Sequence, residues 1–368
     1  MSDALTYLAA RVREASETKE RLRIRGGETK TFLAGVPDAA TLDMRVHAGI
    51  VDYAPSELFV TARAGTLLVE LERVLAERGQ CLPCDPPRFA DERGLLAGTV
   101  GGMVAAGLAG PGRAAVGGVR DYVLGVLLLN GNGELMHFGG QVMKNVAGYD
   151  VSRLLAGSWG ALGAICEVSL KVLPVPPATL TLRFDMNQAD ALEQLHAWAG
   201  QPLPLNASVW WRDTLAVRLR GANAAVASAA RKMGGETIPG ALADAFWEGL
   251  RDQRDEFFLE AQQAVELRQR ALWRLSVPAT TPVLPAFDDT LIEWGGAQRW
   301  VLAAGDDDKV PACASRAGGS ALRVLGGLPG KGALNPTPLP AALGAIHARL
   351  RESFDPRGVF VPGRPMNI

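Results

Sequence analysis

The chain has 368 residues, of which 48% are hydrophobic, and a net charge of −1. This length can bury sizeable cores and predicts two domains rather than one. The near-neutral charge offers no electrostatic footprint for nucleic acid, and four cysteines are too few for a disulfide framework, which fits a reducing cytoplasm.

Residues 1–20 predict an amphipathic helix. Apolar residues recur there at helical spacing among charged ones: Leu5, Leu8, Ala9 and Val12. A secretory signal peptide needs an uninterrupted apolar core, which this segment lacks. No signal peptide is therefore expected.

A glycine pair follows a short apolar strand in the segment RGGETK, from Arg25 to Lys30. Exposed main-chain N–H groups beside basic side chains suit a pyrophosphate. The segment is therefore a candidate phosphate-binding loop.

The stretch from Ala64 to Pro87 predicts a helix and a cysteine-bearing loop. Thr66 is available as the N-cap of the helix and Gly79 as its stop signal. The loop contains CLPC, from Cys81 to Cys84, which raises a thiol redox pair or half of a metal site as alternatives. No second C-x-x-C exists to complete a zinc site, so the cysteines are interpreted as incidental.

A nearly uncharged, glycine-rich run extends from Leu95 to Gly110 and contains GTVGG at residues 98–102. Glycine loses more backbone freedom on folding than any other residue, so such a cluster indicates that main chain must approach something closely. A flat, phosphate-bearing cofactor is the natural candidate. A membrane span is the alternative, but the run is short for a bilayer and only weakly hydrophobic.

The run from Arg120 to Pro174 predicts paired strands. Residues 130–133 read NGNG between two apolar runs, which is typical of a hairpin turn rather than a nucleotide loop. No G-x-G-x-x-G follows a first strand and no G-x-x-x-x-G-K-[ST] occurs. The nicotinamide-Rossmann and P-loop folds therefore lack their residues.

The proline cluster at residues 174–177 predicts a domain boundary. Beyond it strands and helices alternate, with a strand pair around Asp213-Thr214, a helix from Ala241 to Phe258 and a hairpin about Gly295-Gly296. This interleaving predicts an α+β domain with an antiparallel sheet. Seven of the eight tryptophans fall here, and core packing is favoured over a subunit interface.

The length and order of these motifs resemble the flavin-binding domain shared by vanillyl-alcohol oxidase and p-cresol methylhydroxylase (PCMH), which holds FAD between two small α+β subdomains. Within that family, GGQVMKNVAGYDVSRLLAGS and the tail FDPRGVFVPGRP are similar to the smaller FAD-binding subunits of bacterial glycolate oxidase. The resemblance is strong over about residues 20–175 and 340–365 and thin between them.

The resemblance implies an α+β fold with three parts. These are a two-subdomain PCMH-type FAD-binding domain at 1–175, an α+β cap with an antiparallel sheet at 178–335, and a C-terminal segment at 340–368, with a helix to about residue 353, that returns to the first domain. It implies FAD, which is expected to be non-covalent because no histidine or cysteine stands at a recognisable linkage position. Motif order gives the candidate cofactor-binding residues: Arg25, Gly26, Gly27, Glu28, Thr29, Lys30, Pro83, Asp85, Pro86, Gly98, Thr99, Val100, Gly101, Gly102, Lys144, Asn145, Gly148, Tyr149, Gly163 and Ile165.

The function implied is that of an FAD-binding subunit of a glycolate oxidase complex, oxidising glycolate to glyoxylate. The implied partners are a second FAD-binding subunit and an iron–sulfur subunit, with electrons leaving toward quinone. The chain is expected in the cytoplasm, held at the inner face of the membrane only through partners. Two alternatives stay open: a self-sufficient FAD-dependent 2-hydroxy acid dehydrogenase, and a non-catalytic scaffold that keeps the fold.

Oxidation of a 2-hydroxy acid by a flavin needs a base for the hydroxyl proton and a cation for the carboxylate. The histidines are His47, His137, His196 and His347, and only His137, just before a glycine pair, merits a test as the base. Catalytic relatives typically carry a His-rich motif in the cap, but no HGDGNxH-like sequence occurs between residues 178 and 335. No catalytic residue and no metal site is assigned, which favours a partner-dependent subunit.

Overall fold

The computed structural model describes residues 2–34, 36–141, 149–267, 270–304, 308–326 and 339–363. The chain divides into two compact units. Unit 1 comprises Met1–Leu108, Gly118–Val175 and Pro338–Ile368, and unit 2 comprises Ala109–Gly117 and Pro176–Thr337. No helix in the described ranges is long and apolar enough to cross a membrane.

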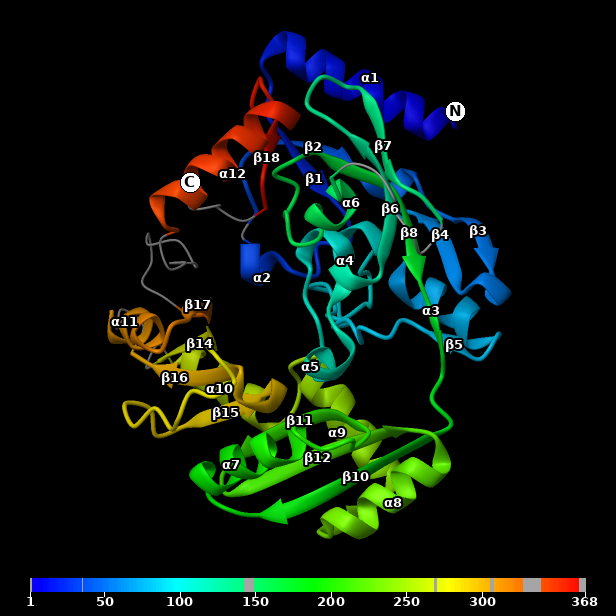
Figure 1. Ribbon diagram of the computed structural model, residues 1–368. Coiled ribbons are helices and arrows are strands. Elements are labelled where there is room, and N and C mark those ends of the chain that lie inside the picture. The colour runs from blue at the N-terminus through cyan, green and yellow to red at the C-terminus, as the bar shows by residue number, and fades with distance from the viewer. Residues whose placement is uncertain are drawn as a thin grey trace. The chain divides into compact units, whose positions relative to one another are not determined.

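Unit 1 combines short helices with two main sheets (Figure 1). Its helices are α1 (Asp3–Thr18), α2 (Thr31–Ala34), α3 (Leu68–Ala76), α4 (Val100–Ala106), α6 (Val151–Leu154) and α12 (Ala341–Phe354), with 3-10 turns η1 (Met44–Val46), η2 (Pro55–Glu57) and η3 (Val119–Asp121). Its strands are β1 (Leu22–Arg25), β2 (Ala40–Asp43), β3 (Ile50–Ala54), β4 (Phe59–Arg63), β5 (Gln80–Cys81), β6 (Val123–Leu129), β7 (Leu135–Gly139), β8 (Ala164–Lys171), β9 (Leu173–Pro174) and β18 (Phe360–Val361).

The two main sheets of unit 1 differ in strand direction. One is parallel, in the order β18-β1-β2, and the other is antiparallel, in the order β3-β4-β8-β6-β7. Strand β6 is buried along its whole length, because its run of Val and Leu side chains packs on both faces. Unit 1 therefore combines helices with two small sheets, which confirms the predicted α+β fold class.

The hairpin predicted at residues 130–133 joins β6 to β7. The side chain of Asn130 accepts hydrogen bonds from the main-chain N–H groups of Asn132 and Glu134, which fixes the turn. Gly133 has a φ of +75°, and a Cβ there would overlap the Cγ of Arg13. The turn therefore packs directly against α1, whose inward face carries the predicted Leu5, Leu8, Ala9 and Val12.

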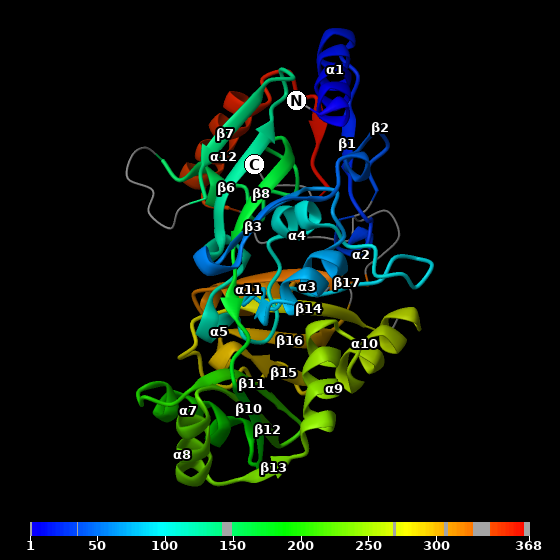
Figure 2. The same ribbon diagram turned by 90° about the vertical axis from the view of Figure 1, so that its right-hand side faces the viewer.

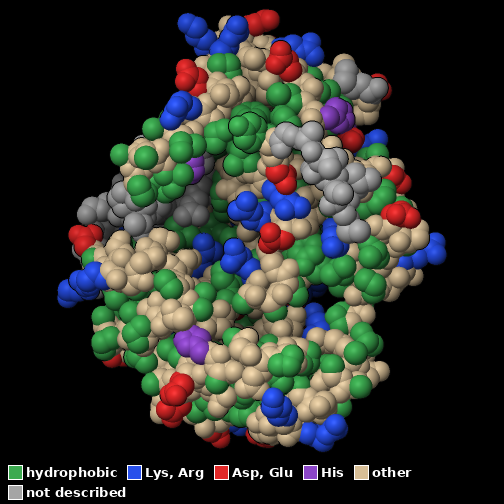
Figure 3. Space-filling view, in the orientation of Figure 1, with side chains coloured by type: hydrophobic (Ala, Val, Ile, Leu, Met, Phe, Trp, Pro, Cys, Tyr) green, Lys and Arg blue, Asp and Glu red, His purple; other side chains and the backbone are tan. Residues whose placement is uncertain are grey.

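The C-terminal segment runs back along the first strand of unit 1. Strand β18 pairs with β1 in parallel, with Phe360 opposite Leu22. Buried Asp355 fixes the turn before β18, since its carboxylate accepts from the N–H groups of Val359 and Phe360 at 2.8 and 2.9 Å. Hydrophobic side chains gather over the region of α12 in Figure 3, where Leu343 and Ile346 are exposed.

Unit 2 is built on one antiparallel sheet in the order β13-β10-β12-β11-β15-β16-β14-β17. Its strands are β10 (Ala178–Asp185), β11 (Leu205–Trp211), β12 (Thr214–Gly221), β13 (Glu236–Ile238), β14 (Ala271–Ser276), β15 (Thr290–Glu293), β16 (Gln298–Ala303) and β17 (Ser320–Leu325). Its helices are α5 (Arg113–Val116), α7 (Gln188–Ala199), α8 (Asn223–Met233), α9 (Gly240–Arg251), α10 (Glu256–Glu266) and α11 (Lys309–Arg316), with the 3-10 turn η4 (Trp294–Gly296).

Helices cover both faces of this sheet. Figure 2 shows α7 and α8 on one face and α9 and α10 on the other. Tryptophans fill the layers between helices and sheet, which supports core packing as their main role: Trp198, Trp210, Trp247, Trp273 and Trp300 are buried, whereas Trp211 and Trp294 are half-buried. The predicted antiparallel sheet is confirmed.

Three local predictions need correction. The helix expected from Ala241 to Phe258 is two helices, because Gln253 takes a φ of +55° and Asp255 caps α10 by accepting from the N–H of Phe258. The strand pair in β11–β12 turns at Arg212 and Asp213, one residue earlier than expected.

The third correction concerns the cap of α3. Leu67, not Thr66, is its N-cap residue. The hydroxyl of Thr66 is engaged instead with the main chain of Gly49, as acceptor from the N–H at 2.9 Å and as donor to the carbonyl at 3.1 Å. A tertiary contact has therefore replaced the local cap.

Candidate functional site

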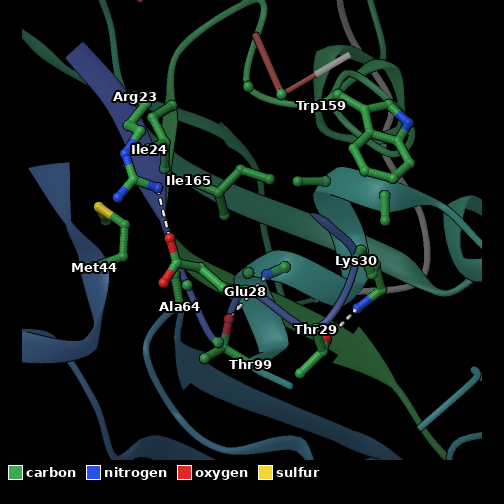
Figure 4. Close-up of a pocket in the computed structure, with 18 of the residues that line it drawn as sticks. Arg23, Ile24, Glu28, Thr29, Lys30, Met44, Ala64, Thr99, Trp159 and Ile165 are labelled. Carbon is green, nitrogen blue, oxygen red and sulfur yellow. Dashed lines mark hydrogen bonds and ion pairs between the residues drawn. The ribbon is translucent and has the colours of Figure 1, made fainter. Parts of the chain in front are cut away.

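Unit 1 contains a cavity of about 1010 Å³ of space between atoms, part of it open to solvent (Figure 4). The loop between β1 and α2 forms one wall and the start of α4 forms another. The remaining wall comes from η1, β4, β8, the segment 159–163 and the C-terminal segment: Met44, Ala64, Trp159, Gly160, Gly163, Ile165, Val361 and Gly363.

The loop after β1 presents main-chain donors without protein acceptors. Glu28 has a φ of +52°, so the chain coils sharply at the tip of the loop. The N–H groups of Gly27, Glu28, Thr29 and Lys30 donate to no acceptor among the described residues. Consecutive unpaired N–H groups in such a turn form a concave anion-binding nest. This is the local chemistry that the sequence predicted for the loop.

The second glycine segment begins a helix rather than a free loop. Thr99 is the N-cap of α4, and its hydroxyl accepts from the N–H of Gly102 at 3.2 Å. The N–H of Gly101 donates to the carbonyl of Ala64, and that of Val100 donates to the carbonyl of Thr66. These donors are used inside the protein, so this wall contributes shape to the cavity rather than main-chain hydrogen bonds.

Close packing between the two loops explains most of the cradle glycines. A Cβ on Gly27 would overlap the carbonyl oxygen of Ala97, and one on Gly26 would lie 2.7 Å from the Oγ1 of Thr99. A Cβ on Gly101 would lie 2.6 Å from that of Ala64. The sequence predicted that main chain approaches a cofactor here. In the structure these glycines lie in close contact with other segments of the protein, and the cavity lies beside this contact.

The ionisable side chains that line the cavity are Arg23, Glu28 and Lys30. The guanidinium of Arg23 lies 2.5 Å from the carboxylate of Glu28, and the guanidinium of Arg25 lies 2.9 Å from it. Among the described residues Lys30 has no such partner. Its ammonium lies 3.4 Å from the hydroxyl of Thr29, and burial lowers its pKa to about 8. Figure 4 shows the Arg23–Glu28 pair and the Thr29–Lys30 pair as separate groups.

The structure brings half of the predicted residues to the cavity: Gly26, Gly27, Glu28, Thr29, Lys30, Thr99, Gly101, Gly102, Gly163 and Ile165. Seven others lie outside its wall: Arg25, Pro83, Asp85, Pro86, Gly98, Val100 and Tyr149. Arg25 lines an adjacent cavity with Arg45 and Asp91, while Tyr149 is 98% exposed. Lys144, Asn145 and Gly148 lie outside the described residues.

Several lining residues escaped sequence reasoning. Trp159 and Gly160 lie within the long block that the resemblance covered, and Val361 and Gly363 lie within its tail, so both signals were present. Ala64 begins the stretch from Ala64 to Pro87, but it was not singled out there, and Arg23 and Met44 carry no motif. They reach the cavity because β1, η1 and β4 meet there in space.

No histidine lines the cavity within the described chain. His137 is exposed on β7. His47 is 1% exposed, with its Nε2 at 3.6 Å from the carboxylate of Glu167, and burial lowers its pKa. The cavity thus supplies donors for an anion but not a histidine base.

Burial disfavours a reactive thiolate at one cysteine of the CLPC loop. Cys84 is 1% exposed, and burial raises the pKa of its thiol far above the usual range, which disfavours the reactive thiolate. Neither cysteine forms a disulfide, and the described residues contain no cluster of His, Cys, Asp or Glu suited to a metal ion.

Comparison with known proteins adds sequence and fold relatives. A family model described as an FAD binding domain matches residues 6–139. The chain is 42% identical to the glycolate oxidase subunit GlcE of Escherichia coli K12, over 97% of this chain and 96% of that one. It is 31% identical to the glycolate oxidase subunit GlcD of Bacillus subtilis, over 39% of this chain and 30% of that one.

Two further matches concern a part of the sequence and the fold. The chain is 34% identical to a D-lactate dehydrogenase of Anaerostipes hadrus, over 36% of this chain and 26% of that one. Among solved structures, an alkyldihydroxyacetonephosphate synthase matches with a TM-score of 0.61 and 15% identity, over 96% of this chain and 75% of that one. The match to the synthase concerns the fold alone.

Proposed function

Because the chain belongs to the family of the glycolate oxidase subunit GlcE, we propose that it is the FAD-binding subunit of a glycolate oxidase complex. It takes part in the oxidation of glycolate to glyoxylate and passes electrons onward together with partner subunits. The observation that carries this proposal is the 42% identity over nearly the whole of both chains. The chain is a flavoprotein oxidoreductase subunit, and its cofactor is FAD.

The residues of the cavity fit FAD. The unpaired N–H groups of Gly27 to Lys30 and the ammonium of Lys30 form a donor set suited to a diphosphate. The apolar wall formed by Ala64, Ala105 and Ile165 excludes water beside it. When bound, FAD supplies a flavin ring that accepts a hydride from the hydroxyl-bearing carbon of the substrate. We propose that it is held without a covalent bond.

The partners are a second FAD-binding glycolate oxidase subunit and an iron–sulfur subunit. Two features support this dependence on partners. No histidine lines the described cavity, and no HGDGNxH-like sequence occurs between residues 178 and 335. A base for the substrate hydroxyl would then come from outside this cavity. The complex is proposed to lie in the cytoplasm, at the inner face of the membrane.

A self-sufficient 2-hydroxy acid dehydrogenase is the second candidate. The match to a D-lactate dehydrogenase favours it, but this match covers only 36% of the chain. Oxidation without partners would need a base that the described cavity does not show. A scaffold that lost FAD is less consistent with a cavity that retains unpaired donors.

An absorption spectrum of the purified chain, followed by anaerobic addition of glycolate and D-lactate, separates these functions. We expect a yellow protein whose flavin stays oxidised alone and bleaches with glycolate when the partner subunits are co-purified. Bleaching of the isolated chain would identify a self-sufficient enzyme. A colourless protein that takes up no added FAD would leave only the scaffold.

A further inference from the structure

We propose that the side chain of Lys30 is the charge partner of the cofactor's diphosphate and makes the affinity for FAD fall at alkaline pH. This inference rests on the proposed function, since it places the diphosphate of FAD on the loop after β1. It goes further in assigning the affinity for a phosphorylated ligand, and the pH at which that affinity is lost, to one titrating side chain.

The first support is the charge balance of the cavity. Of its three ionisable lining groups, Arg23 pairs with Glu28 at 2.5 Å, and Arg25, which lies outside the wall, pairs with the same carboxylate at 2.9 Å. The ammonium of Lys30 has no carboxylate within ion-pair distance in the described part of the chain. The lining therefore keeps one uncompensated positive charge, and a bound anion is what would compensate it.

The second support is position. Lys30 is the last residue of the nest formed by the N–H groups of Gly27 to Lys30, so its ammonium and these donors belong to one loop. Its hydrogen bond to the Oγ1 of Thr29, at 3.4 Å, is long and weak. An anion bound by the nest can accept a hydrogen bond from the ammonium of Lys30, and no ion pair has to break for this.

The third support is burial. Lys30 is half-buried, and the removal of water around its ammonium lowers its pKa to about 8 from the usual 10.5. An adjacent diphosphate favours the charged form and raises this pKa again. Above about pH 8 the free protein has lost the proton that the complex holds, so binding must take one up. Proton linkage then weakens binding by about tenfold per pH unit.

The groups around Lys30 do not compete for this role. Arg23 and Glu28 come from β1 and from the loop itself, and remain paired. The helix α4, the turn η1 and the strands β4, β8 and β18 contribute uncharged lining residues: Thr99, Met44, Ala64, Ile165 and Val361. In the adjacent cavity Arg45 and Arg93 pair with Asp43 and Asp91. Main-chain N–H groups do not titrate in this range.

The same burial gives an independent signature in the cofactor-free protein. The folded pKa of about 8 lies below the unfolded value of 10.5, so folding releases a proton between these values. The cofactor-free protein therefore gains stability as the pH rises through that window. Below about pH 8 the buried ammonium destabilises the fold, and its removal raises the melting temperature.

The test uses the full chain freed of cofactor, with FAD affinity measured by quenching of flavin fluorescence from about pH 7 to about pH 10. For the wild type we expect a constant Kd below about pH 8 and a rise of about tenfold per pH unit above it. Lys30→Arg should hold its affinity across the range, because a guanidinium does not titrate there. Lys30→Met should bind about 10- to 100-fold more weakly at neutral pH, without the pH dependence. ADP should follow FAD, and riboflavin, which has no phosphate, should not.

The matched control is Lys232→Met, on the exposed surface of α8 in unit 2, which should leave the Kd and its pH dependence unchanged. Lys30→Met should also raise the melting temperature of the cofactor-free protein. Tight FAD binding with a Kd independent of pH, or a Lys30→Met variant that behaves like Lys232→Met, would overturn the role of Lys30 and leave the proposed function standing. A wild type that binds no FAD at any pH would overturn both.

Discussion

Polar groups at the cavity of unit 1 and in the sheet of unit 2 differ in how fully they are hydrogen-bonded. In unit 2 the guanidinium of buried Arg299 donates to the carbonyl oxygens of Thr281, Pro282 and Gly296. Buried Glu293 accepts from the side chains of Gln298 and Trp300 at 2.9 and 2.7 Å. In unit 1 the loop before α2 keeps consecutive N–H groups and an ammonium that have no strong partner among the described residues.

This difference separates a structural use of polar groups from a binding use. Burial of a polar group is costly unless it is hydrogen-bonded. A core therefore satisfies such groups within the chain, as unit 2 does for Arg299 and Glu293. Donors that stay unpaired beside a cavity can instead be satisfied by a bound ligand or by water. In this protein the unpaired donors, more than the glycines, mark the site that we propose for the cofactor.

The largest effect is expected at the contact between the two cradle loops. Gly27→Ala should cost about 3 kcal/mol and abolish FAD binding, because the new Cβ would overlap the carbonyl oxygen of Ala97. Gly98→Ala is the matched control, since its Cβ would lie 3.7 Å from the nearest atom, the Oγ1 of Thr29. Urea unfolding and FAD titration measure both. Equal behaviour of the two variants would contradict close packing as the reason for Gly27.

Removal of the Asp355 carboxylate, which holds the turn before β18, should have the next largest effect on stability. Asp355→Ala leaves the buried N–H groups of Val359 and Phe360 without acceptors and should cost about 2–3 kcal/mol. The pairing of β18 with β1 should loosen, exposing that edge to hydrogen exchange. Unchanged exchange at β1 would show that the C-terminal segment is held by other contacts.

In unit 2 a substitution is expected to stabilise the protein rather than to destabilise it. Burial raises the pKa of Glu293 to about 7, above its usual 4.5. This carboxyl therefore favours the fold fully below about pH 4.5 and loses that contribution as the pH rises through about 7. Glu293→Gln keeps an acceptor for Trp300 and should stabilise the protein by about 1–3 kcal/mol at pH 8. Little gain is expected at pH 5.

Glu248→Gln is the control for this experiment, because Glu248 is exposed on α9. Thermal unfolding at the two pH values reports both variants. A Glu293→Gln protein that is less stable than the wild type at pH 8 would show that the carboxylate is charged and favourable in the core.

The smallest effect is expected at the cysteines. Cys81 is only half-buried, and Cys81→Ser should change stability by less than about 0.5 kcal/mol. The double variant with Cys84→Ser should keep its FAD, at a cost of about 1 kcal/mol for the buried hydroxyl. Loss of turnover with FAD still bound would instead indicate a role for the thiols in electron transfer.

Much of the fold follows from local sequence. The NGNG turn and the amphipathic first helix formed as predicted, because each depends on short-range periodicity or turn chemistry. The RGGETK segment is a loop with a sharp turn at Glu28, and its binding of a phosphate stays a prediction. The antiparallel sheet of unit 2 followed from the alternation of its strands. The helix predicted from Ala241 to Phe258 did not form as one, since the cap at Asp255 competes with apolar spacing that continues through the break.

The sequence by itself determined the type of fold and the cofactor class, through its motifs and their order along the chain. It also predicted the loop that we propose binds a phosphate. Only the tertiary structure decided which side chains share the cavity. Met44, Ala64 and Val361 line it from separate parts of the chain. No local sequence pattern predicts that these three side chains lie close together. The tertiary structure also decided that Arg23 pairs with Glu28 whereas Lys30 has no carboxylate partner in the described part of the chain, because pairing depends on distances in space rather than on order in the chain.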